Sequence, residues 1–158
     1  MIEPRSKLRI SIASLAISAS AFLGLIIHEG YSDKAYIPIP GDVPTLGFGT
    51  THGVQMGQRI DPVNAVSRAL NDVSTFEGSI KSCVKVPLAQ HEYDSLVSFT
   101  YNVGSTAFCN STLVKKLNTQ DYEGACLEML RWTKSKGKQI PGLIIRRQKE
   151  FKQCMGLS

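Results

Sequence analysis

Residues 28–50 of the chain read HEGYSDKAYIPIPGDVPTLGFGT, and this stretch decides the fold. Three prolines and four glycines interrupt it, so it cannot form a continuous helix. Between these breakers, residues 35–37 and 45–48 are typical of short strands or extended turns. We therefore expect a small β-rich lobe in this part of the chain.

The sequence after this lobe has a helical pattern. Asp61 followed by Pro62 predicts a helix start, with Val63, Leu70 and Val73 on its apolar face. Further helices are expected to open at Pro87, Asp121 and Pro141. One small β-rich lobe packed against a mostly helical lobe is an α+β fold.

The segment before the lobe resembles an export signal. Eighteen residues, Ile10 to Ile27, carry no charge, and Arg5, Lys7 and Arg9 precede them. A basic flank before such a stretch is typical of a membrane signal, and the length just reaches that of a spanning helix. Its many Ser, Ala and Gly residues make its preference for lipid marginal.

This N-terminal segment has three interpretations. It is a signal peptide cleaved near residues 19–21, a buried core helix, or a reversible anchor that leaves the membrane and folds onto the domain. We favour the anchor, which divides the chain into a signal-anchor helix at residues 1–28 and a folded domain at 29–158. The basic flank would stay inside and the domain would face the periplasm.

Composition and cysteine usage bound the possible partners. The net charge of +5 favours anionic partners, but the basic residues are scattered, so we expect no nucleic-acid binding. The cysteines, whose spacing does not suggest zinc, are Cys83, Cys109, Cys126 and Cys154. They are either buried hydrophobes of a cytosolic protein or one or two disulfides formed in an oxidising compartment, with three full pairings open. We expect no metal and no cofactor.

Two carboxylates could share the chemistry of glycoside hydrolysis. Glu29 follows the long apolar segment, where partial desolvation would let it hold a proton as a general acid. Asp42 lies in a stiff turn of prolines and glycine, three residues before Thr45. Glycosidases usually need two such carboxyl groups, although Asp beside Gly is also a common turn residue.

Three ordered blocks resemble the phage lysozymes of glycoside hydrolase family 24. They are Glu29-Gly30 with Lys34-Ala35-Tyr36 and Thr45–Thr50; Phe99–Gly104 with Ala107-Phe108 and Ser111–Leu113; and Gly124-Ala125 with Arg131-Trp132, Gly137-Lys138, Gly142-Leu143, Arg146–Gln148 and Glu150. They cover roughly residues 28–155. The resemblance implies a lysozyme-like fold and a monomer that cuts the β-1,4 bond between N-acetylmuramic acid and N-acetylglucosamine in peptidoglycan with inversion.

The resemblance also assigns roles to residues. Glu29 matches the general acid, and Thr45 matches the threonine that helps hold the attacking water. The family's usual aspartate position is Pro38 here, so the water-orienting role goes to Asp42, with Asp33 as the alternative. Thr50 stands where some members have histidine, and His52 follows two residues later.

The resemblance further suggests four supporting or substrate-binding residues. They are Tyr36, Asn102, Arg146 and Arg147. One of the two arginines could pair with Glu29, although a solvated basic helix face is an equal explanation for either.

An enzyme whose N-terminal segment is held in the membrane would be inactive until the segment is released. Glu29 would lie at the bilayer surface, apart from its partners, until the segment leaves the inner membrane for the periplasm. Two rival functions stay open: a lytic transglycosylase acting on the same bond, and a catalytically dead wall-binding protein.

Overall fold

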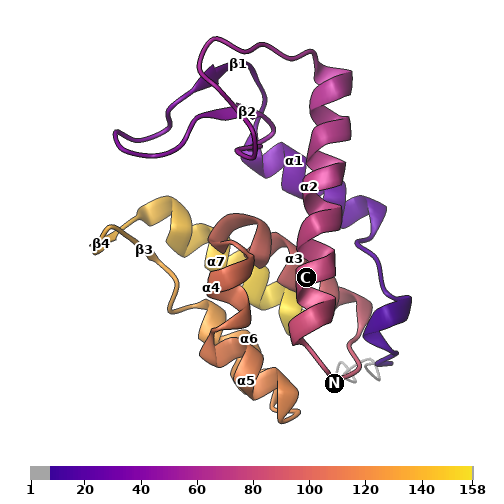
Figure 1. The fold of residues 1–158 in the computed structure, drawn as a ribbon. Helices are drawn as coiled ribbons and strands as arrows, with labels where there is room; N and C mark the ends of the chain where they lie inside the picture. The colour runs from indigo at the N-terminus through magenta and orange to yellow at the C-terminus, as the bar shows by residue number, and fades with distance from the viewer. Residues whose placement is uncertain (1–7, 158) are drawn as a thin grey trace. The chain divides into compact units, whose positions relative to one another are not determined.

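The computed structural model describes residues 8–157, which divide into two compact units (Figure 1). One unit is Ala19–Thr75. The other joins the described residues up to Ser18 to those from Phe76 onward. The first unit holds the larger β-hairpin and the second holds most of the helices, which confirms the predicted α+β class.

The first unit opens with a helix and a hairpin. α1 spans Ala19–Glu29, and β1 (Ser32–Tyr36) pairs antiparallel with β2 (Thr45–Gly47). Ser32 lies opposite Gly47 and Tyr36 opposite Thr45, with an irregular register between the two pairs. The predicted strands are therefore confirmed, and β1 begins three residues earlier than expected.

A long helix, α2 (Pro62–Cys83), contributes residues 62–75 to the first unit and its remainder to the second. Its start agrees with the prediction, because Asp61 Oδ1 accepts a hydrogen bond from the Asn64 backbone N–H at 3.0 Å. The Asn64 hydrogen bonds also hold the pKa of Asp61 below its ordinary value. A carboxylate at this position satisfies free N–H groups of the first turn.

The predicted apolar face of α2 is partly wrong. Val63 and Leu70 are exposed, whereas Ala65, Ala69 and Val73 are buried. Small alanines serve here because the hairpin backbone approaches closely: a methyl group placed on Gly47 would lie 3.0 Å from the Ala65 Cβ. The buried face of α2 is thus determined by the close approach of the hairpin, which the hydrophobic pattern alone does not reveal.

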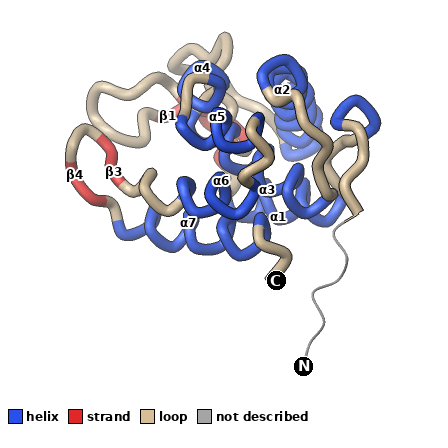
Figure 2. Tube along the Cα trace, turned by 90° about the horizontal axis from the view of Figure 1, so that it is seen from below, coloured by secondary structure: helices blue, strands red, loops and turns tan. Residues whose placement is uncertain are grey.

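The second unit is a cluster of helices (Figure 2). Its elements after α2 are α3 (Gln90–Val103), α4 (Ser105–Cys109), α5 (Thr112–Asn118), α6 (Tyr122–Met129), β3 (Lys134–Ser135), β4 (Lys138–Gln139) and α7 (Pro141–Cys154). α3 packs along α7, and α5 packs along α6. The helix starts expected after Asp121 and at Pro141 are confirmed, whereas α3 begins three residues beyond Pro87.

The expected N-terminal apolar helix over residues 10–27 is not confirmed in its first half. Only the part from Ala19 onward is α-helical, and a short 3₁₀ turn, η1 (Ile12–Ser14), precedes it. Ile10 instead forms an antiparallel bridge with Leu88, with N–H···O distances of 2.9 and 3.0 Å. Leu15 is buried.

Carboxylates distant in sequence explain this break. They accept hydrogen bonds that would otherwise be made within a helix, and they pair with the flanking charge. The bonds are Glu77 with the Ile17 N–H (2.7 Å), Asp94 with the Ser18 N–H and hydroxyl (2.9 and 2.7 Å), and Glu92 with the Arg9 guanidinium (2.7 and 3.1 Å). Arg5 and Lys7 of the predicted basic flank lie outside the described residues. None of the described helices combines the length and the apolar content needed to span a bilayer.

The four cysteines form two disulfides within the second unit. Cys83 at the end of α2 joins Cys109 at the end of α4, and Cys126 of α6 joins Cys154 of α7. The Cα–Cα distance is 5.7 Å in both bridges. Of the interpretations left open by the sequence, the structure thus selects two disulfides and one pairing.

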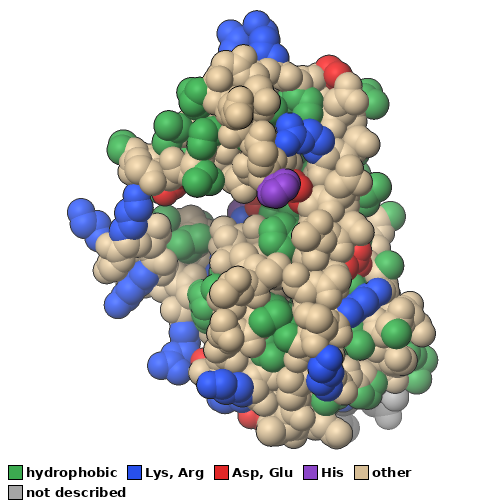
Figure 3. Space-filling model, in the orientation of Figure 1, with side chains coloured by type: hydrophobic (Ala, Val, Ile, Leu, Met, Phe, Trp, Pro, Cys, Tyr) green, Lys and Arg blue, Asp and Glu red, His purple; other side chains and the backbone are tan. Residues whose placement is uncertain are grey.

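Basic side chains are dispersed on the surface. On the face drawn in Figure 3, the Lys and Arg side chains of the described residues lie as singles and small groups, without one continuous basic patch.

Candidate functional site

Glu29 is the last residue of α1, and its side chain is half-buried. The Gly30 N–H still bonds to the Ile26 carbonyl at 3.1 Å, and Gly30 then takes a φ of +72°. A glycine in the left-handed region ends a helix without a Cβ clash. The end of α1 therefore fixes the position of the Glu29 carboxylate next to the start of the hairpin.

The turn after β2 lies against this carboxylate. Gly49 has a φ of +82°, and a methyl group placed on it would lie 3.1 Å from Glu29 Oε2. Leu46 and Thr50 close the turn with two backbone hydrogen bonds of 2.9 and 3.0 Å. The segment Thr45–Thr50, named here the catalytic turn, thus contacts Glu29 through its glycine.

Thr45 is the first residue of the catalytic turn, and Asp42 lies three residues before it. Thr45 is buried at the start of β2, and its hydroxyl donates to the Val43 carbonyl at 3.4 Å, a long hydrogen bond. Asp42 is half-buried in the loop between the strands, where its N–H bonds to the Ile39 carbonyl at 2.9 Å. Tyr36, opposite Thr45 in the hairpin, is exposed. All these predicted residues lie in the first unit with Glu29.

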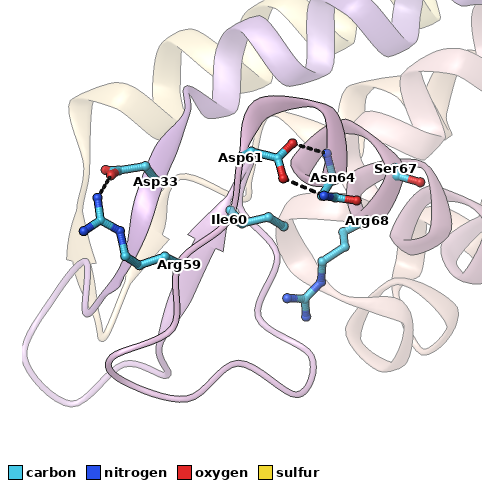
Figure 4. Close-up of a pocket in the computed structure, with 7 residues that line it drawn as sticks. All are labelled: Asp33, Arg59, Ile60, Asp61, Asn64, Ser67 and Arg68. Atoms are coloured by element: carbon cyan, nitrogen blue, oxygen red, sulfur yellow. Dashed lines mark hydrogen bonds and ion pairs between the residues drawn. The ribbon is translucent and has the colours of Figure 1, made fainter.

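Asp33, the alternative second carboxylate, has a different setting. It lies on β1 and forms an ion pair of 2.8 Å with Arg59. The pair lines an open depression of about 650 Å³ that also includes Asp61, Asn64 and Arg68 (Figure 4). Both side chains of the pair are largely exposed, and the Arg59 guanidinium already occupies the Asp33 carboxylate.

The other predicted residues belong to the second unit, where they bind one another. Arg147 is fully buried and donates to Asn102 Oδ1, to Glu150 and, at 3.0 Å, to the Trp132 carbonyl. Arg146 is also buried and donates to Glu150 Oε1 at 3.1 Å. Burial lowers the pKa of Arg147 from its ordinary value, and the Glu150 carboxylate opposes that shift.

These contacts give Arg146 and Arg147 a structural role within the helical unit. Both arginines bind Glu150 within α7, so neither is a solvated basic face. Buried guanidinium groups need such partners, since an unpaired charge in the interior is costly. The contacts described here make Arg147 and Asn102 supports of the helical unit.

One polar pair was not predicted from the sequence. The buried Thr50 hydroxyl donates to Asp72 Oδ2 on α2 at 2.6 Å. Thr50 is one of the positions where the chain departs from the family pattern, but nothing in the sequence identifies its partner 22 residues later. Among the described residues there is no group of three or more His, Cys, Asp or Glu side chains able to hold a metal ion.

The first unit can therefore supply the elements of acid-base chemistry. One carboxyl group ends an apolar helix, and a hydroxyl and a second carboxylate come from the adjoining hairpin. Glycoside hydrolysis requires a proton donor for the leaving oxygen and a second group acting on water or on the sugar.

Comparison with known proteins agrees with this chemistry. The family model described as phage lysozyme matches residues 27–150. An endolysin of Acyrthosiphon pisum secondary endosymbiont phage 1 is 42% identical over 134 residues, covering 80% of this chain and 91% of the relative. A SAR-endolysin of Pseudomonas phage phiKMV is 36% identical over 144 residues and covers 89% of both chains.

A solved structure gives the same result for the fold. The muramidase domain of SpmX from Asticaccaulis excentricus superimposes with a TM-score of 0.79 at 27% identity, covering 87% of this chain and 96% of that domain. The fold is therefore lysozyme-like. The matched region begins just before Glu29 and includes the hairpin and most of the helical unit. The chain belongs to the phage lysozyme family and is a peptidoglycan-hydrolysing muramidase.

Proposed function

We propose that Glu29 is the general acid of this muramidase and that Asp42 and Thr45 orient the attacking water. The contact of the Glu29 carboxylate with Gly49, four residues after Thr45, carries the proposal. Glu29 donates its proton to the glycosidic oxygen between N-acetylmuramic acid and N-acetylglucosamine. Water held by the hairpin attacks the anomeric carbon from the opposite face and gives a proton to the Asp42 carboxylate, so the product has inverted configuration.

Substitution of each group tests these roles. We expect Glu29→Gln to lower kcat on purified cell walls by about a thousandfold or more, since it removes the proton donor but keeps the shape. We expect Asp42→Asn to lower kcat by about tenfold to a hundredfold. Glu123→Gln, an exposed residue at the start of α6, is the matched control and should retain wild-type turnover.

The products complete the test. Hydrolysis leaves reducing ends, whereas a lytic transglycosylase leaves anhydro ends, and mass spectrometry separates the two. Proton NMR of fresh product should show the α-anomer if the reaction inverts. Full activity of Glu29→Gln would overturn the proposal, and loss of activity in Asp33→Asn but not in Asp42→Asn would transfer the second role to Asp33.

For localisation, we propose that residues 1–28 first tether the enzyme to the host inner membrane, with the N-terminus inside, and then leave it. The catalytic domain, residues 29–158, acts in the periplasm as a monomer on peptidoglycan glycan strands. The name SAR-endolysin of the phiKMV relative and the uncharged stretch after Arg9 support this proposal. The polar contacts of residues 9–18 with α2 and α3 also support it, because they offer the released segment hydrogen bonds that lipid lacks.

Cell fractionation of the full chain tests the tether. The Glu29→Gln background prevents lysis, and a variant with Ser11→Leu, Ser14→Leu and Gly24→Leu should stay in the membrane fraction. These positions are exposed in the folded chain, so leucine there strengthens membrane insertion without disturbing the core. The parent should divide between membrane and soluble periplasm. A parent found only in the cytoplasm would overturn the proposal.

A further inference from the structure

The catalytic turn is attached to α2 at two points. Gly47 packs against Ala65, where an added methyl group would lie 3.0 Å from the Ala65 Cβ. Thr50 donates its hydroxyl hydrogen bond to Asp72 at 2.6 Å. Ala65 and Asp72 are seven residues apart, two turns along one face of the helix. α2 therefore supports the turn at two points, near its middle and at its last residue.

The second attachment is buried and specific. Thr50 is 3% exposed, so its hydroxyl donates in an environment that makes hydrogen bonds to a carboxylate strong. Its backbone N–H and carbonyl are already used in the pairing with Leu46. The side-chain bond is therefore an additional constraint, which fixes the turn to the helix and not only to itself.

This hydrogen bond restrains the residues to which we assign the chemistry, Glu29 and Thr45. Thr50 directly follows Gly49, which lies against the Glu29 carboxylate, and it pairs with Leu46, which directly follows Thr45. A displacement of Thr50 would move both the surface that faces Glu29 and the hydroxyl at the start of β2. Rate constants respond steeply to such shifts, about a hundredfold for 1 Å.

We propose that Asp72 is a positioning residue of the enzyme, acting through the Thr50 hydroxyl to hold the catalytic turn against Glu29. The inference rests on the roles proposed above for Glu29 and Thr45. It assigns a function in catalysis to a helix residue that needs no contact with substrate. Position 50 needs only a hydrogen-bond donor for this role, and the neutral threonine hydroxyl supplies one.

A set of variants separates positioning from stability. Thr50→Val removes the donor at constant shape, Thr50→Ser restores it, and the double variant Thr50→Val/Asp72→Leu removes both partners. The double variant avoids leaving the half-buried Asp72 carboxylate without its partner, which alone would destabilise the fold. Thr75→Val, an exposed threonine on the same helix, is the matched control.

We expect Thr50→Val and the double variant to lower kcat by about tenfold, with KM within about twofold of wild type. Thr50→Ser should recover most of kcat, and Thr75→Val should match wild type. The basic limb of the pH–rate profile, which reports the proton on the acid, should move in Thr50→Val and not in Thr75→Val. Rates are measured well below the melting temperature of every variant.

Two outcomes would overturn the inference. If the double variant regains both stability and wild-type kcat, the pair is only structural. If Thr50→Val keeps wild-type kcat and pH profile while Glu29→Gln is inactive, positioning fails but the proposed chemistry stands. An active Glu29→Gln would instead refute the proposed function itself, so the two failures are distinguishable.

Discussion

Gly49 combines two requirements at one residue. Its φ of +82° disfavours any side chain, and a Cβ would lie 3.1 Å from Glu29 Oε2. Gly53 has a similar φ of +69° but no heavy atom within 4 Å of the Cβ position. The two glycines therefore separate the effect of backbone strain from the effect of contact with the Glu29 carboxylate.

We expect Gly49→Ala and Gly53→Ala each to lower the free energy of unfolding by about 1–2 kcal/mol, because both force alanine into the left-handed region. Only Gly49→Ala should also lower kcat, by about tenfold or more, since its methyl group displaces the Glu29 carboxylate, the proposed acid. Thermal melting and turbidity clearing of purified walls measure the two effects. Equal rates in both variants would show that the close contact does not matter for catalysis.

At the scale of elements, residues 9–18 are fixed by polar groups more than by apolar burial. Glu92 is 1% exposed and binds both the Arg9 guanidinium and the Ala89 N–H. Arg9 also lies over the Tyr122 ring, 3.5 Å from its centroid. Because these contacts are few, the segment should open locally before the unit unfolds.

We expect Glu92→Gln to lower the free energy of unfolding by about 1–3 kcal/mol and to speed tryptic cleavage after Arg9 under native conditions. Glu128→Gln is the matched control, since Glu128 pairs with Lys116 and Arg131 away from this segment. Mass spectrometry of the fragments gives the cleavage site and rate. Equal cleavage after Arg9 in both variants would mean that the carboxylate does not hold the segment.

Elements with local signals could be predicted from the sequence, and elements with distant partners could not. The starts of α2 and α7 follow from Asp61-Pro62 and Pro141, because caps and proline act within one turn. The break before Ala19 depends on Glu77 and Asp94, which are 60 and 76 residues from the groups they bind. No local pattern encodes such a contact.

The candidate site divides in the same way. The sequence indicated Glu29, Asp42 and Thr45, since the residues that shape their turns are neighbours in the chain. It did not indicate the partners of the buried Thr50 and Arg147 side chains, which are 22 and 45 residues away. Those pairings are products of tertiary packing.

At the scale of the whole molecule, both disulfides lie in the second unit, and the first unit, with Glu29, has none. The bridges join residues 26 and 28 positions apart. Closing loops of this length stabilises a fold by about 3 kcal/mol each in the chain-entropy description.

We expect the double variants Cys83→Ala/Cys109→Ala and Cys126→Ala/Cys154→Ala each to melt several degrees lower, by about 5–10 °C. Turnover measured well below the transition should change little, because neither bridge involves the unit that holds Glu29. Circular dichroism with and without reductant measures the shift. Wild type that melts at the same temperature under both conditions would contradict this role.

The docking of residues 9–18 also has a consequence in time. Arg9 is translated before its partner Glu92, which follows it by 83 residues. At about 5–20 residues per second, several seconds pass in which the emerging segment has no protein surface to bind. In the export route proposed above, the order of synthesis would give the secretion machinery first access to the segment, and docking onto the enzyme becomes possible only after α3 has been translated.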